Sequence, residues 1–123
     1  MADPLVDAGG LTVYTDRQLV VTRTEMPDGL RFLGEIDLSN STAIARSLIP
    51  LLSMNANPHL DMTDLIFCDV SGIRALVTVA QNLGPDRRLR LHGLEPQIER
   101  VIRVIGWSGD SGGLGFCAGG DCQ

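Results

Sequence analysis

The chain contains no lysine, and all ten of its basic side chains are arginines. Arginine stays protonated in proteins, so the chain offers no Schiff-base lysine and none of its arginines can act as a general base. Aromatic residues make up only 4% of the sequence, so the core is expected to be aliphatic. The three cysteines are an odd number, which argues against a framework of disulfides.

The sequence also lacks long apolar runs and an excess of positive charge. No stretch approaches the roughly 18–20 apolar residues that a membrane-spanning helix needs. Residues 1–10 have neither the basic region nor the apolar run of a signal peptide. We therefore predict a cytoplasmic protein with no membrane partner. The formal net charge is −5, and an acidic chain repels phosphate backbones, so no nucleic-acid partner is expected.

The apolar content is sufficient for one packed domain. Apolar residues form 44% of the 123 residues, and this length is typical of a single domain. We predict a flexible N-terminus at 1–10, the folded domain at 11–107 and a Gly-rich tail at 108–123. The tail is expected to supply no more than a short edge strand at 114–116.

Periodicity and turn residues predict alternating strands and helices. Strands are expected at 11–24, 30–36, 59–62 and 87–92, and the first two are expected to form a hairpin. Amphipathic helices are expected at 41–54, with a kink or restart at Pro50, and at 73–83, followed by a third that ends at Gly106. Leu65 and Phe67 are expected to bury a connecting segment. This order predicts an α/β fold whose mixed sheet of about four to five strands has amphipathic helices packed against it.

Motifs of known enzyme classes are missing. Ser71 is not preceded by the glycine of a nucleophile elbow, and no dinucleotide-binding or Walker pattern occurs. His59 and His92 lie in or at the ends of predicted strands, where a structural role is more common than catalysis. Cys117 and Cys122 have no second pair of ligands to complete a metal site. We therefore predict no enzyme activity, no cofactor and no metal.

The turn Asp69-Val70-Ser71-Gly72 lies where a strand gives way to a helix. Backbone N–H groups at a helix start lack partners, so an acid or a hydroxyl has electrostatic leverage there. The turn is either a binding or regulatory surface, or an ordinary N-cap whose glycine permits close packing. Cys68 beside it is either an oxidant sensor with a lowered pKa or a small buried hydrophobe.

Three segments in this order resemble a known family. They are Gly-Glu-Ile-Asp-Leu at 34–38, the turn at 69–72, and the segment 94–106. Together they resemble the STAS domain of bacterial anti-sigma factor antagonists, over about 19–107. The resemblance implies a STAS-like fold and a small cytoplasmic switch without catalysis. Such a protein binds an anti-sigma factor, often a serine kinase of the histidine-kinase-like ATPase type, and thereby frees a sigma factor.

The resemblance also implies roles for particular residues. Asp69 matches the acid that caps the helix, and Gly72 matches the glycine of the motif. The binding surface would include the helix start with Arg74, and the neighbouring loop with these residues: Asp37, Ser39 and Asn40. Val70 occupies the phosphoacceptor position, where valine offers no hydroxyl. Ser71 is then either an alternative acceptor or a first-turn residue that bonds the backbone.

Competing functions follow from the same scaffold. The first is an anti-sigma factor antagonist without the usual phosphoacceptor; the alternative is a small-ligand or redox-sensing STAS module. An enzyme of flavodoxin-like shape is the weakest, since no acid–base or nucleophile pair is present.

The family usually adds a last strand and helix, which the Gly-rich tail cannot complete. The far sheet edge is therefore uncovered or paired with another chain, which leaves monomer and homodimer open.

Overall fold

The computed structural model of the protein describes residues 11–25, 28–53, 58–84, 87–106, 114–118 and 121–122. The predicted flexible N-terminus at 1–10 and the turn at Met26 and Pro27 lie outside them. The helices are α1 Ser41–Leu52, α2 Val70–Gln81 and α3 Pro96–Ile105. The strands are β1 Thr12–Thr15, β2 Leu19–Glu25, β3 Asp28–Ile36, β4 His59–Cys68, β5 Leu89–His92, β6 Leu114–Ala118 and β7 Asp121–Cys122.

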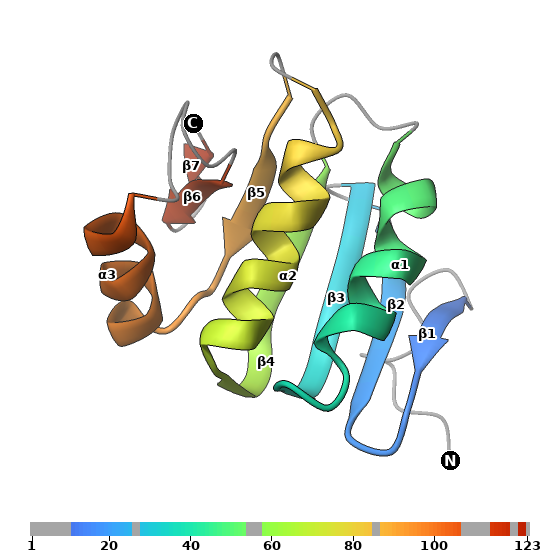
Figure 1. Cartoon of the computed structure of the whole chain (residues 1–123). Helices are drawn as coiled ribbons and strands as arrows, with labels where there is room; N and C mark the ends of the chain where they lie inside the picture. The colour runs from blue at the N-terminus through green and yellow to red at the C-terminus, as the bar shows by residue number, and fades with distance from the viewer. Residues whose placement is uncertain are drawn as a thin grey trace.

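The strands form one mixed sheet of seven strands, in the order in which they occur along the chain (Figure 1). Strands β1, β2 and β3 pair antiparallel, and β3, β4, β5 and β6 pair parallel. The helices α1, α2 and α3 are the crossovers between these parallel strands, while β7 returns antiparallel to β6. The predicted mixed α/β fold is confirmed.

The sheet has more strands than the predicted four to five, for two reasons. The segment 11–24 is two strands, because a turn at Asp16 reverses the chain between β1 and β2. The Asp16 carboxylate accepts hydrogen bonds from the backbone N–H groups of Gln18 and Leu19, each at 2.8 Å. The β-branched content around it favoured one long strand. The tail supplies more than the expected short edge strand at 114–116, since β6 pairs with β5 inside the sheet and β7 pairs with β6 as its edge.

The core is aliphatic and lies between the sheet and the helices. Figure 1 shows α1 and α2 side by side across one face of the sheet. In β3, Leu30, Phe32 and Ile36 are at most 2% exposed. Ile102 of α3 and Leu114 of β6 are also fully buried. Helix α1 continues through Pro50 without a restart and ends two residues later.

Strand β4 is longer than the predicted 59–62, and its end is not buried as expected. It runs to Cys68 because pairing with β3 continues as far as Ile36 opposite Cys68, across two irregularities of register. Leu65 is half-buried, but Phe67 is 49% exposed and its neighbour Ile66 is 75% exposed. The prediction that Phe67 helps to bury a connecting segment is therefore wrong. The segment is part of strand β4, and the Phe67 side chain is largely open to solvent.

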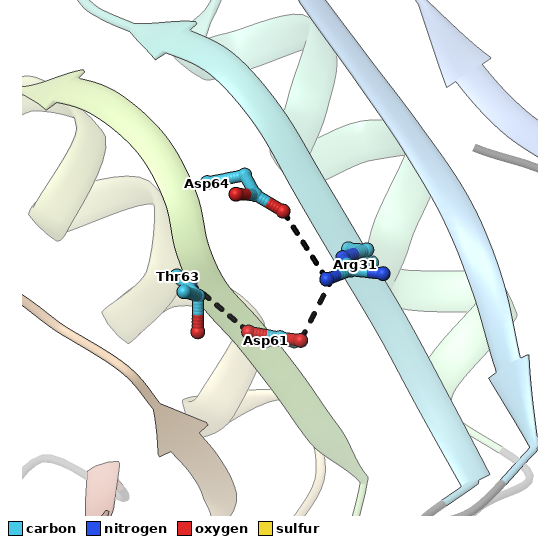
Figure 2. A network of polar contacts seen from close by, with 4 residues as sticks. All are labelled: Arg31, Asp61, Thr63 and Asp64. Atoms are coloured by element: carbon cyan, nitrogen blue, oxygen red, sulfur yellow. Dashed lines mark hydrogen bonds and ion pairs between the residues drawn. The ribbon is translucent and has the colours of Figure 1, made fainter. Parts of the chain in front are cut away.

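Polar side chains occupy the opposite face of the sheet at β3 and β4. Figure 2 shows Arg31 of β3 between Asp61 and Asp64 of β4, with the helices behind the strands. Arg31 Nη2 lies 3.2 Å from Asp64 and Arg31 Nε lies 3.7 Å from Asp61. Asp61 also accepts a hydrogen bond from the Thr63 backbone at 3.0 Å. These partly exposed charges show that helix α1 and helix α2 cover only one face of this part of the sheet.

Two glycines allow close approaches that a side chain would prevent. Gly34 has a φ of +125°, and a Cβ there would lie 2.1 Å from the Gln18 carbonyl oxygen. At Gly72, in the first turn of α2, a Cβ would lie 2.7 Å from both Cys68 Sγ and Ile36 Cγ2. Gly72 therefore sets how closely α2 packs on the ends of β3 and β4.

Replacing Gly72→Ala is expected to lower the free energy of unfolding by about 1–3 kcal/mol, the usual cost of overpacking a core. Urea unfolding followed by circular dichroism measures it. The matched control is Gly115→Ala in β6, where the nearest atom to a new Cβ is at 3.7 Å, an ordinary contact. Equal changes in the two variants would contradict the role given to Gly72.

Candidate functional site

Two loops meet at the carboxyl end of the parallel strands β3 and β4. Residues 37–40 connect β3 to α1, and Asp69 connects β4 to α2. Because Ile36 lies opposite Cys68 in the sheet, both loops leave from the same edge (Figure 1). The backbone N–H of Asp69 donates to the carbonyl of Ile36 at 3.2 Å and joins them directly. The sheet thus brings together two motifs that are about thirty residues apart along the chain.

The start of α2 has the geometry of a capped helix. Asp69 has an extended backbone, and its carboxylate accepts a hydrogen bond from the backbone N–H of Gly72 at 3.0 Å. This satisfies one of the unpaired donors of the first turn. Val70 is the first helical residue and is 51% exposed. Ser71 is half-buried, and its hydroxyl makes no hydrogen bond within the described part of the chain.

The loop 37–40 is held in shape by its own side chains. Asp37 accepts hydrogen bonds from the hydroxyl of Ser39 at 2.6 Å and from its backbone N–H at 2.9 Å. The Ser39 hydroxyl, more than any other group, holds the pKa of Asp37 below its ordinary value. Leu38 between them is 76% exposed. The predicted site did not include Leu38.

Asn40 is buried and holds the loop in shape, so its predicted part in the binding surface would be to position the loop. It is only 5% exposed. Its Oδ1 accepts from the Asp37 backbone at 2.9 Å, and its Nδ2 donates to Asp16 and to the Glu35 carbonyl, each at 3.0 Å. A buried amide with three such bonds fixes the loop. Sequence alone could not reveal this burial, because Asp16 is far from Asn40 along the chain.

Asp16 is another residue of this region that the sequence did not reveal. Besides Asn40 and two backbone N–H groups, its carboxylate accepts the Tyr14 hydroxyl at 2.5 Å. Burial raises the pKa of Asp16, but the hydrogen bonds, that of Tyr14 foremost, outweigh it and leave the pKa below its ordinary value. Burial, followed by the hydrogen bond to Asp16 and the charge of Asp16, raises the pKa of Tyr14 to about 12.

A groove of about 490 Å³ lies between α1 and α2, next to both loops. Leu38 and Val70 line one end of it, and Ala45 and Ala75 are its small buried residues. The predicted residues Val70, Ser71 and Arg74 share this groove. Asp37, Ser39 and Asp69 shape the adjoining loops, while Gly72 and Asn40 are buried beneath. Arg46 and Ile49 of α1 line the groove too and were not predicted.

Cys68 is a small buried hydrophobe. Its exposed fraction is 8%, and burial, with the neighbouring charge of Asp69, raises its pKa to about 12. A sensing thiol needs a lowered pKa and access to solvent. These surroundings favour the alternative of a small buried hydrophobe, since the thiol packs against the first turn of α2 at Gly72, and a redox role of Cys68 stays a prediction.

The two histidines contact each other. His59 Nδ1 lies 2.6 Å from His92 Nε2, so the two imidazoles bond each other between β4 and β5. Within the ranges that the structure describes, no group of three or more His, Cys, Asp or Glu side chains could hold a metal ion. No helix in those ranges has the length and apolar character needed to cross a membrane.

Asp16→Asn is expected to lower the free energy of unfolding at pH 7 by about 1–3 kcal/mol, because an amide nitrogen cannot accept from Tyr14 and Asn40. Since folding lowers the pKa of Asp16, the ionised carboxylate stabilises the fold above the unfolded pKa of about 3.9. This stabilisation is lost as the pH falls through the folded pKa. Urea unfolding between pH 2 and 7 should therefore show a shallower acid dependence in the variant. The control is Glu95→Gln, an exposed acid without a capping hydrogen bond, which should behave as wild type.

The Cys68 thiol is expected to resist alkylation in the folded protein, because burial keeps it protonated. The test uses the variant with Cys117→Ser and Cys122→Ser, in which Cys68 is the sole thiol. Iodoacetamide at pH 8 should modify the folded protein far more slowly than the urea-unfolded chain, as followed by mass spectrometry. Equal rates would show that the thiol is accessible and ionisable.

Known proteins share this architecture. The family described as Mlab, STAS domain matches residues 19–115. No curated protein matches the sequence. An anti-sigma factor antagonist from Mycobacterium paratuberculosis is similar at 19% identity and a TM-score of 0.55, covering 72% of this chain and 76% of that one. The antagonist SpoIIAA in its unphosphorylated form is 19% identical, with a TM-score of 0.49 and coverages of 76% and 80%.

The same fold also occurs inside a membrane protein. The murine Solute Carrier 26 family member A9 anion transporter, in its inward-facing state, is similar at 19% identity and a TM-score of 0.55. The match covers 71% of this chain, which spans only 16% of the transporter chain. At such identities the solved structures establish the fold alone. The family match covers most of the chain, and the protein therefore belongs to the STAS domain family.

Proposed function

We propose that the protein is an anti-sigma factor antagonist, a cytoplasmic binding module that engages an anti-sigma factor and so releases a sigma factor. The observation that supports this most is the junction of the two loops at one sheet edge. It places exposed Leu38 and Val70 at the mouth of the groove between α1 and α2. Exposed apolar side chains that cluster on a rigid frame are typical of a protein-binding surface. The proposed activity is binding, without catalysis or a cofactor.

The proposed surface consists of the loop 37–39 and the exposed side of α2. Asp69 and Gly72 support it from within, since one caps the helix and the other lets it pack closely. Val70 and Arg74 then face outward along the first turns of α2. A partner that covers this surface would bury Leu38 and Val70 together, which contributes roughly 1.5–3 kcal/mol per fully buried side chain.

Phosphorylation could not regulate this surface in the way that it regulates an antagonist whose acceptor directly follows the aspartate that matches Asp69. Val70 has no hydroxyl, so the protein is competent to bind whichever kinase is present, unless Ser71 is the acceptor. Ser71 lines the groove. A phosphate there would add about −1.5 to −2 charges at the contact surface. We propose an anti-sigma factor of the serine-kinase type as the partner, with Ser71 as its candidate substrate.

A small-ligand module is the second candidate, because the groove volume lies within the range of ligand pockets. The two functions differ in what occupies the groove. A small ligand would raise the melting temperature of the isolated protein, whereas an antagonist needs a protein partner. Binding of a purified anti-sigma factor separates them.

Val70→Glu is expected to weaken capture of the anti-sigma factor by roughly tenfold or more, because it removes the apolar contact of Val70 and places a charge in the contact surface. Full burial of such an apolar side chain contributes roughly 1.5–3 kcal/mol, which exceeds the 1.4 kcal/mol of a tenfold change. The measurement is affinity capture from the native cell with mass spectrometry, followed by calorimetry with the purified anti-sigma factor. Stability should be kept, because an acid in the first turn of a helix is favourable by about 0.3–1 kcal/mol.

The matched control is Val104→Glu on α3, which changes the net charge equally at a residue that is 81% exposed. It should bind as wild type. Equal binding by the wild type and Val70→Glu would contradict the proposed surface. Failure of the wild type to bind any serine-kinase anti-sigma factor would contradict the proposed function.

A further inference from the structure

The groove between α1 and α2 differs in charge from the rest of the molecule. The chain has 15 acidic and 10 basic residues, yet the groove is lined by two arginines and no acid. Arg46 belongs to α1 and Arg74 to α2, so the two walls of the groove contribute one positive charge each. An acidic protein thus has a positively charged groove beside its most exposed apolar residues.

Arg46 and Arg74 differ from other arginines in the described part of the chain. Both are exposed, and within the described residues neither makes an ion pair or a side-chain hydrogen bond. Other arginines do, as Arg31 pairs with two aspartates and Arg103 pairs with Glu99. The positions three and four residues from Arg46 and Arg74 hold no acid, so pairing along either helix is not available.

The floor of the groove allows another segment to lie close. Ala45 and Ala75 face each other's helices with small side chains, and both are buried. A segment placed along the groove would therefore contact apolar surface at its base and at Leu38 and Val70. The guanidinium groups of Arg46 and Arg74 would stand at its sides, and guanidinium matches a carboxylate with two parallel hydrogen bonds.

We infer that the groove binds an acidic amphipathic segment of the anti-sigma factor, with carboxylates of that segment paired to Arg46 and Arg74. The inference rests on the proposed function, since it names the part of the partner that this surface accepts. The apolar side of the segment covers the floor of the groove and its mouth. The charge pairs select the partner, because a basic segment would meet like charge on both walls.

The test measures the dissociation constant for the purified anti-sigma factor at low and high salt. Arg46→Glu and Arg74→Glu should each weaken binding about tenfold or more, and Arg46→Gln and Arg74→Gln should weaken it less. The wild type should lose affinity as salt rises, and the double Glu variant should lose less, because its charge pairs are gone. Both arginines are exposed, so melting temperatures should stay close to that of the wild type.

Arg100→Glu on α3 is the matched control, since Arg100 is exposed and its replacement changes the net charge equally. It should bind within about twofold of wild type. If Arg100→Glu lost as much affinity as Arg46→Glu and Arg74→Glu, the effect would be due to overall charge, and the inference would be overturned. Unchanged binding by the Arg46 and Arg74 variants, with binding abolished by Val70→Glu, would overturn the inference and leave the proposed function intact. No binding by the wild type would contradict both.

Discussion

The parallel pairing of β3 with β4 is the constraint on which the candidate site depends. It brings Ile36 opposite Cys68, so the loops that follow the two strands leave from the same edge. The hydrogen bond from Asp69 to the Ile36 carbonyl joins the loops at their bases. Gly72 then lets α2 pack on the two strand ends without a Cβ in the way. Without this register, the two motifs would lie on separate parts of the surface.

A polar network at the other side of the loop 37–40 complements that pairing. The Asp16 carboxylate accepts hydrogen bonds from the backbone of the turn that follows it, from the Tyr14 hydroxyl and from the Asn40 amide. The Asn40 amide also forms hydrogen bonds with the backbone of Asp37 and of Glu35. The buried amide of Asn40 and the partly buried carboxylate of Asp16 are satisfied only when β1, β2 and the loop are in place together. The network explains how exposed Leu38 keeps a defined position. The exposed position of Leu38 therefore depends on the hydrogen bonds of Asp16 and Asn40 beneath the loop.

The STAS fold alone does not determine the partner, since it also forms a small part of an anion transporter chain. What distinguishes this chain are the side chains on α1 and α2. Val70 offers neither a charge nor a hydroxyl at the first residue of α2, and Arg46 and Arg74 line the groove within an acidic protein. A groove of this kind favours a partner that brings its own carboxylates. Charge selectivity would then replace part of the control that a phosphate at the helix start would give.

The sequence by itself determined the helices, the alternation of strands and helices, and the cap and glycine at the start of α2. These depend on periodicity, turn residues and neighbours within a few positions. Only the tertiary structure decided that 11–24 is two strands, that Phe67 is exposed, that Asn40 is buried and that the Cys68 thiol is kept protonated. It also decided that Arg46 joins Arg74 in one groove. The physical reason is that burial and polar partners come from strands and helices far apart along the chain, and their contacts exist only once the sheet has paired.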